Sequence, residues 1–159
     1  MKFSFFNCTS VSQIIQEEYF PLTVLWGEQD ELVRHYGIHY KNSSLLEFST
    51  GWENNRAQKL VLTLSQDYCS VSQSMPLPET ANEAELHISG SRRMEAEILQ
   101  TIVYTDGVVI RLNDGLTMAA YKCGKIYFLI GAEGKLLSIC IGHMTVDEVV
   151  HVSYELNVQ

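Results

Sequence analysis

The last third of the chain limits the possible folds more than any other part. Residues 116–142 predict three β-strands divided by glycine turns. The segment 145–156 that follows is open to two interpretations. Thr145 with Glu148 forms a capping-box pattern, which favours a helix. Apolar and polar residues alternate from Val150 to Val158, which is typical of a strand. A helix is the preferred interpretation, and a strand remains the alternative.

The upstream residues add further strands with short connections. Strand-like runs are expected at residues 2–6, 22–26, 32–40, 44–49, 59–66, 85–89, 94–105 and 108–112. A short helix is expected over residues 13–19, where Ser10 or Ser12 is the cap and Pro21 is the stop. Residues 74–85, which contain two prolines and no periodicity, predict a loop.

These elements predict one α+β domain over residues 1–159, because a chain of 159 residues is about one domain long. We expect a twisted, mostly antiparallel sheet of about six to nine strands, with one or two helices packed on one face.

Charge and hydropathy exclude several classes of partner. The net charge of −8 repels phosphate backbones, so nucleic-acid binding is not expected. No apolar run is long enough for a transmembrane helix, and the first residues lack the pattern of a secretion signal. The compartment stays open: cytoplasmic, or extracytoplasmic if an upstream segment was removed. The oligomeric state is also open.

The four cysteines, Cys8, Cys69, Cys123 and Cys140, are widely spaced, and no pair has the C-x-x-C spacing of a zinc or redox site. Buried thiols are the preferred interpretation, and one or two disulfides are the alternative.

Five segments together resemble a known family. They are Phe48-Ser49-Thr50-Gly51, residues 62–66 (LTLSQ), residues 86–90 (LHISG), residues 121–131 (YKCGKIYFLIG) and residues 144–150 (MTVDEVV). Their order over residues 48–156 resembles the uncharacterised extracytoplasmic domain of bacterial anti-sigma-factor-like membrane proteins and lipoproteins. Tyr121 stands where that pattern has Trp, and residues 135–142 add a strand. The resemblance implies an α+β sheet with a binding or sensing role and no known reaction.

Six side chains are candidates for contact with a ligand or partner. His35 and His39 share one face of a predicted strand, and Gly37 between them leaves room. Two imidazoles without a third ligand favour solvated histidines over a metal site, so no metal or cofactor is predicted. The aromatic candidates are Trp26, Tyr36, Tyr40 and Trp52, which would form an apolar surface if they lie on an open sheet face.

These features indicate a non-enzymatic binding or sensor module that holds a protein segment or a small apolar ligand on an aromatic sheet face. The chain lacks a nucleophile elbow and a complete catalytic motif. The alternative is a small acidic cytoplasmic inhibitor, such as an immunity protein, that blocks a toxin by direct binding.

Overall fold

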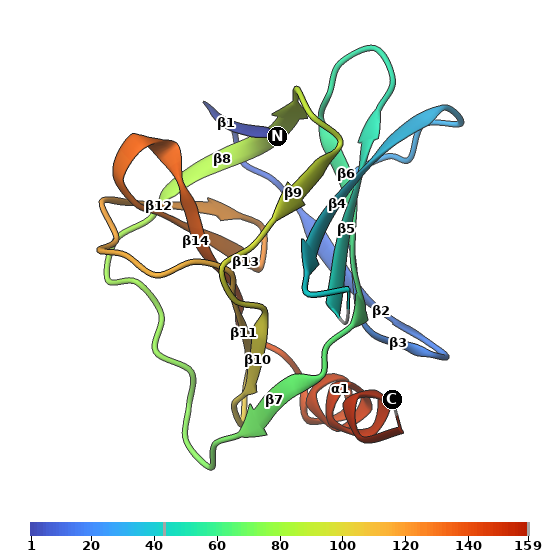
Figure 1. The fold of residues 1–159 in the computed structure, drawn as a ribbon, viewed down its shortest axis with the longest axis vertical. Helices are drawn as coiled ribbons and strands as arrows, with labels where there is room; N and C mark the ends of the chain where they lie inside the picture. The colour runs from blue at the N-terminus through green and yellow to red at the C-terminus, as the bar shows by residue number, and fades with distance from the viewer. Residues whose placement is uncertain (43, 159) are drawn as a thin grey trace.

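The computed structural model describes residues 1–42 and 44–158, which form 14 strands, one 3₁₀ turn (η1, Ala132–Gly134) and one α-helix (α1, Val146–Val158). The strands lie in two sheets, and α1 lies at the lower right of the molecule, beside β7, as drawn in Figure 1.

The larger sheet has eight strands. In spatial order they are β1 (Lys2–Asn7), β8 (Asn82–Ser89), β12 (Ala119–Cys123), β13 (Ile126–Ile130), β14 (Leu136–Ile141), β11 (Val108–Arg111), β10 (Gln100–Val103) and β7 (Asp67–Ser70). The pairs β8–β12 and β7–β10 are parallel, and the other pairs are antiparallel.

The smaller sheet has six strands. In spatial order they are β2 (Ser12–Glu17), β3 (Phe20–Trp26), β6 (Ala57–Leu64), β5 (Ser44–Gly51), β4 (Val33–Tyr40) and β9 (Arg93–Glu95). Only its edge pair β4–β9 is parallel among the described strands.

The predicted fold class is confirmed: the chain is a sheet-rich domain with a C-terminal helix packed against the sheets. The division of the strands differs from the expectation, because the described residues form two sheets of eight and six strands instead of one.

One hydrophobic core fills the space between the two sheets. Phe48 of β5 and Phe128 of β13 are both fully buried, and their ring centroids are 6.4 Å apart. Alternation along each strand produces this core: in β8, Ala84, Leu86 and Ile88 are buried, whereas the residues between them are not. The two sheets therefore stabilise each other through their inner faces.

The helix expected over residues 13–19 is wrong, because this segment is strand β2. It pairs antiparallel with β3, with Ile14 opposite Val24, and Ile14 packs against the core. Tyr19 has a φ of 71° at the turn between the two strands. Pairing with β3 is a tertiary interaction, and it outweighs the local helix pattern.

The single strand expected over residues 94–105 is also wrong, because the chain changes sheets within it. Arg93–Glu95 forms β9 at the edge of the smaller sheet, and Gln100–Val103 forms β10 in the larger one. The buried residues Ala96 and Leu99 lie in the connection and pack into the core.

The C-terminal segment is a helix, which confirms the preferred interpretation. Thr145 N donates to Glu148 Oε2 at 2.8 Å, and Glu148 N donates to Thr145 Oγ1 at 3.2 Å, so the capping box is formed. The helix packs against β2 and β3 of the smaller sheet and β10 of the larger sheet.

The four cysteines are all free thiols. Cys123 and Cys140 are buried as expected, whereas Cys8 and Cys69 are exposed. Burial raises the pKa of both buried thiols to about 12, because desolvation disfavours the thiolate. The two buried thiols are therefore protonated near neutral pH.

Candidate functional site

The two predicted histidines lie on the outer face of the smaller sheet. His35 is exposed, and its Nδ1 lies 3.2 Å from Ser49 Oγ. A Cβ built on Gly37 would come within 2.7 Å of His39 Nε2, so the ring of His39 lies over the glycine. Gly37 therefore makes space for this ring. Within residues 1–42 and 44–158, no group of three His, Cys, Asp or Glu side chains is placed to hold a metal ion.

The four predicted aromatic residues lie in three different places. Tyr36 is in the core with 3% exposure, and Tyr40 packs against the core. Trp52 is exposed beyond the end of β5 and stacks under Arg34, with 4.6 Å from the guanidinium carbon to the ring centroid. Trp26 is 6% exposed and lines a cleft. The structure does not bring the six candidates together on one sheet face.

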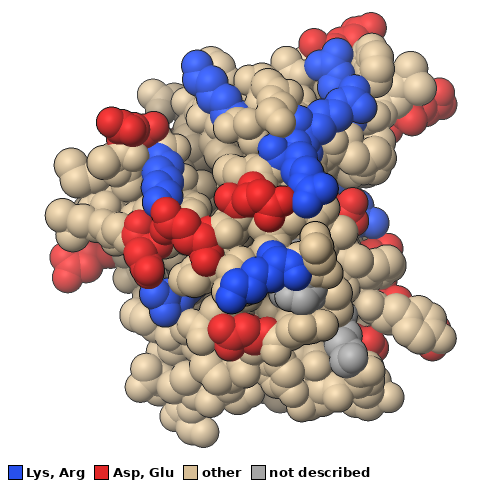
Figure 2. All heavy atoms as spheres, viewed as in Figure 1, with Lys and Arg blue, Asp and Glu red and all other residues tan. Residues whose placement is uncertain are grey.

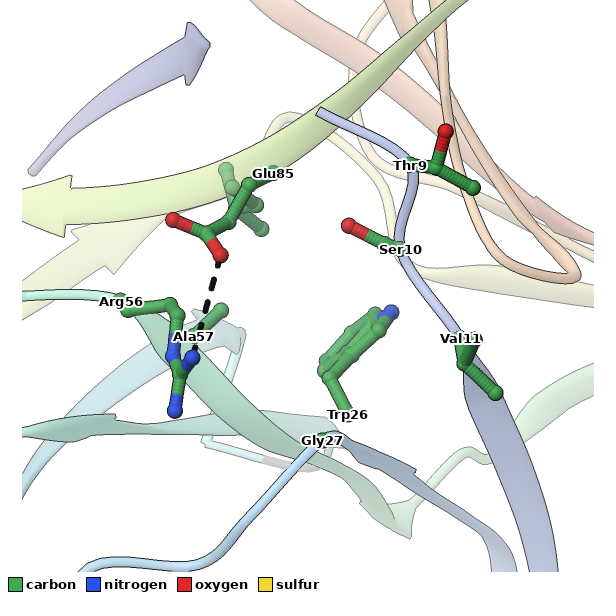
Figure 3. A pocket seen from close by; sticks show the side chains of 9 residues that line it. Thr9, Ser10, Val11, Trp26, Gly27, Arg56, Ala57 and Glu85 are labelled. Carbon is green, nitrogen blue, oxygen red and sulfur yellow. Dashed lines mark ion pairs between the residues drawn. The ribbon is translucent and has the colours of Figure 1, made fainter. Parts of the chain in front are cut away.

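The cleft that Trp26 lines is the candidate site. It has a volume of about 210 Å³ and lies where the linker between β1 and β2 passes the ends of β3 and β6 and the middle of β8. In Figure 3 its walls enclose a space between the indole of Trp26 and the side chains of Arg56 and Glu85. The lining residues are Thr9, Ser10, Val11, Trp26, Gly27, Arg56, Ala57, Glu85 and Leu86.

Trp26 is held in place from the larger sheet. Its indole N–H donates to the carbonyl of Cys123 at the end of β12, with an N···O distance of 3.0 Å. The ring also lies 6.3 Å from Phe128, measured between centroids. These contacts fix the indole, so the apolar wall of the cleft is rigid.

The linker opposite Trp26 is attached at two points. Ser10 Oγ donates to the carbonyl of Ala84 at 2.8 Å, and the amide of Lys125 donates to Ser12 Oγ at 2.7 Å. Gly124, with a φ of 66°, brings the β12–β13 turn so close that a Cβ there would lie 2.7 Å from Ser12 N. The position of this wall therefore depends on a glycine.

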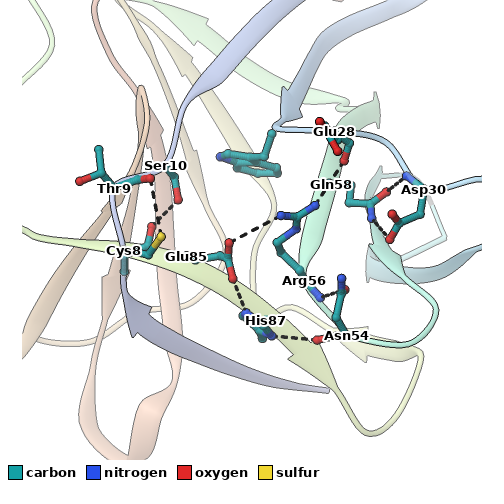
Figure 4. Close-up of polar contacts among 12 residues, drawn as sticks. Cys8, Thr9, Ser10, Glu28, Asp30, Asn54, Arg56, Gln58, Glu85 and His87 are labelled. Carbon is teal, nitrogen blue, oxygen red and sulfur yellow. Dashed lines mark hydrogen bonds and ion pairs between the residues drawn. The ribbon is translucent and has the colours of Figure 1, made fainter.

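The polar wall consists of Arg56 and Glu85. The two sheets meet here, because Arg56, the residue before β6, forms an isolated bridge with His87 of β8. Glu85 Oε1 is 2.7 Å from His87 Nε2, and His87 Nδ1 is 2.9 Å from the carbonyl of Asn54 (Figure 4). This chain of contacts fixes the carboxylate of Glu85 beside the guanidinium.

Arg56 itself has little internal hydrogen bonding. Its Nη1 is 3.9 Å from Glu85 Oε2, which is an ion pair beyond hydrogen-bond distance, and its Nη2 donates to the carbonyl of Glu28 at 3.4 Å. Its buried Nε has no hydrogen-bond partner in the described part of the chain. A buried donor without an acceptor is costly, but Nε is closed off from solvent, so the nitrogen that can serve a ligand is Nη1 beside Glu85.

Of the residues that line the cleft, the sequence analysis named Trp26 as a candidate and did not name Arg56, Glu85 or Ser10. Arg56 and Glu85 lie far apart in the sequence in different sheets, and only the bridge between β6 and β8 places them together. No local motif in the sequence indicates that contact.

A second hollow lies at the loops that follow β3 and β5. The exposed side chains of Leu32 and Trp52 lie there beside Asp30, Glu31 and Glu53, around a volume of about 330 Å³. We call this surface the acidic tip. Asp30 is held from β6, because its amide donates to Gln58 Oε1 at 2.9 Å (Figure 4). The acidic tip presents apolar groups among carboxylates.

Over the face shown in Figure 2, side chains of both signs are mixed. Ion pairs join Arg93 with Glu95 at 2.7 Å and Arg111 with Asp114 at 3.0 Å. Such exposed pairs contribute little to stability. The described residues include no helix of the length and hydropathy that a membrane span requires.

Searches with this chain against protein-family models and against curated proteins found no match.

Proposed function

We propose that this protein is a non-enzymatic binding module that holds a protein segment or a small ligand in the cleft between Trp26, Arg56 and Glu85. The observation that carries the proposal is the cleft itself, in which the guanidinium of Arg56, paired only loosely with Glu85, lies beside a fixed indole. The extracytoplasmic sensor-like family that the sequence resembles is consistent with such a role.

The chemistry of the walls defines the group that fits. The indole and Leu86 favour an apolar body. Arg56 offers a donor, and Glu85 offers an acceptor oxygen that lies 3.9 Å from it. A carboxamide accepts through its oxygen and donates through its nitrogen, so it satisfies both side chains. An apolar group next to an amide is the chemistry of a peptide segment, and the small cleft suits a single side chain with its adjoining backbone.

Intact mass measurement of the protein as purified from cells tests this proposal. We expect a native mass above that of the polypeptide, and the excess disappears on denaturation. The variant Arg56→Met retains the aliphatic length of the side chain but removes the donors, and we expect it to lose the excess. Arg34→Met is the matched control, because Arg34 stacks on Trp52 outside the cleft. An excess of equal size in all three proteins would contradict the assignment to this cleft. A native mass equal to the polypeptide would contradict a tightly held ligand.

The second candidate function is inhibition of a toxin, and the acidic tip favours it. Carboxylates around exposed Leu32 and Trp52 match the basic and apolar surface of a nuclease-like active site. The test is coexpression with a toxin whose gene is found next to the gene of this protein. If this function holds, Trp52→Ala abolishes protection from the toxin whereas Arg56→Met does not. Equal protection by wild type and Trp52→Ala would refute inhibition through the acidic tip.

A further inference from the structure

Helix α1 is apolar on two opposite sides. Its inner side packs Val149, Val152 and Leu156 against the core. On its outer side Val146, Val150, Tyr154 and Val158 are 73%, 59%, 63% and 58% exposed. We call these four residues the outer stripe. An exposed apolar stripe on a helix whose opposite side is already buried is typical of an interaction surface, so the outer stripe calls for a partner.

The outer stripe lies at the opposite end of the molecule from the cleft. His151 Nε2 is 3.2 Å from the carbonyl of Phe20 at the beginning of β3, whereas Trp26 of the cleft ends the same strand. A function of this surface is therefore separate from ligand binding in the cleft.

The spacing of the outer stripe is symmetric. Val150 and Tyr154 are each two residues from Val152, and Val146 and Val158 are each six residues from it. When two such helices pack antiparallel about a two-fold axis, Val150 of each meets Tyr154 of the other, and Val146 meets Val158. Each contact occurs twice and pairs complementary residues, which is the requirement for a symmetric interface.

We propose that the outer stripe of α1 binds a second copy of this chain through an antiparallel helix pair. The distribution of charge leaves α1 as the surface where a second copy is repelled least. The chain has a net charge of −8, which opposes self-association over most surfaces. On the exposed side of α1, however, Asp147 is the single charged residue. In the antiparallel pair the two Asp147 side chains lie at opposite ends, next to the uncharged last turn of the other helix.

Charge argues against a lipid surface as the occupant. Helices that bind membranes from the side carry Lys or Arg beside their apolar face. Helix α1 contains neither, and its first turn has Asp147 and Glu148. Anionic lipids would be repelled there.

The size of the stripe sets the expected affinity. A helix of 13 residues is about 20 Å long, so one helix pair forms a contact at the small end of the range for specific interfaces. We expect a dissociation constant on the order of micromolar, and hence an association that depends on concentration.

Sedimentation analysis over a range of concentrations tests the proposal. We expect the wild-type protein to pass from its 18.0 kDa monomer to twice that mass as the concentration rises. Val150→Glu places a charge at the centre of the stripe and should raise the dissociation constant at least about tenfold. Leu116→Glu is the matched control, because Leu116 is 79% exposed and lies in the connection between β11 and β12, outside α1. This variant should dimerise as the wild type does. Thermal melting verifies that both variants fold.

A charge exchange tests the antiparallel register itself. Val150→Glu and Tyr154→Lys should each be monomeric alone, because each homodimer places charges against apolar residues. Their mixture should dimerise, because one contact becomes a Glu–Lys pair and the other remains Tyr154 against Val150. A wild-type protein that stays monomeric, a dimer that survives Val150→Glu, or a mixture that remains monomeric would each overturn the proposal.

Discussion

Replacing Trp26 by Phe should destabilise the protein much more than replacing Trp52 by Phe. The Trp26 indole is 6% exposed, and its N–H donates to the buried end of β12 at the Cys123 carbonyl. Phe leaves that acceptor without its donor, at a cost of about 1–3 kcal/mol. The smaller ring also leaves unfilled space, which costs about 1–2 kcal/mol. We expect a loss of roughly 2–5 kcal/mol in the free energy of unfolding, or a fall in Tm of roughly 5–15 °C.

Urea unfolding and thermal melting, followed by far-UV circular dichroism, measure this loss. Trp52→Phe is the control: Trp52 is 46% exposed and stacks only on Arg34, so its loss is less than about 1 kcal/mol. If the two variants unfold at the same urea concentration, the indole of Trp26 does not join the two sheets, and the rigid apolar wall of the cleft is refuted.

Four further predictions concern threonine, glutamate and cysteine side chains. Thr50 and Thr23 are both fully buried, but Thr50 Oγ1 has no hydrogen-bond partner in the described residues, whereas Thr23 Oγ1 donates to Glu17 at 2.6 Å. In urea unfolding, Thr50→Val should keep or increase the free energy of unfolding, and Thr23→Val should lower it by about 1–2 kcal/mol. The reverse order would contradict the hydrogen bonding described for the two hydroxyls. The Thr23 hydrogen bond lowers the pKa of Glu17, so the stability that it adds is present above the ordinary carboxyl pKa of 4.5 and is lost as the pH falls below it. Iodoacetamide at pH 8 should label Cys8 and Cys69 in the native protein and the two buried thiols only after unfolding, as mass spectrometry can verify. Labelling of all four thiols in the native protein would contradict the burial of Cys123 and Cys140. The pKa of these two thiols is about 12 in the folded protein against an ordinary value of 9.0, so the free energy of unfolding should fall as the pH rises from about 9 towards 12.

Local patterns in the sequence predict the elements whose stability is local. The capping box at Thr145 and Glu148 predicts α1, and alternation predicts β8. Elements that depend on distant contacts are missed. Strand β2 depends on pairing with β3, and the change of sheet between β9 and β10 depends on burial of Ala96 and Leu99 between the sheets.

The same distinction applies to the candidate site. Alternation along β4 is sufficient to place His35 and His39 on one face of the strand and Tyr36 on the other face. The structure shows Tyr36 in the core. The pairing of Arg56 with Glu85 was not predictable, because it arises only where β6 and β8 of different sheets meet. Trp26, which was predicted to contact a ligand from an open sheet face, lies between the sheets and lines the cleft.

A titration of the ¹⁵N-labelled protein with benzamide tests the central claim most directly. Benzamide combines an apolar ring with a carboxamide, and the spectrum separates the indole N–H of Trp26, the indole N–H of Trp52 and the Nε–H of Arg56. Trp52→Phe assigns the two indole signals. The account predicts that the Trp26 and Arg56 signals shift together and reach saturation while the Trp52 signal stays in place. Unchanged Trp26 and Arg56 signals, or a shift confined to Trp52, would contradict binding in the cleft.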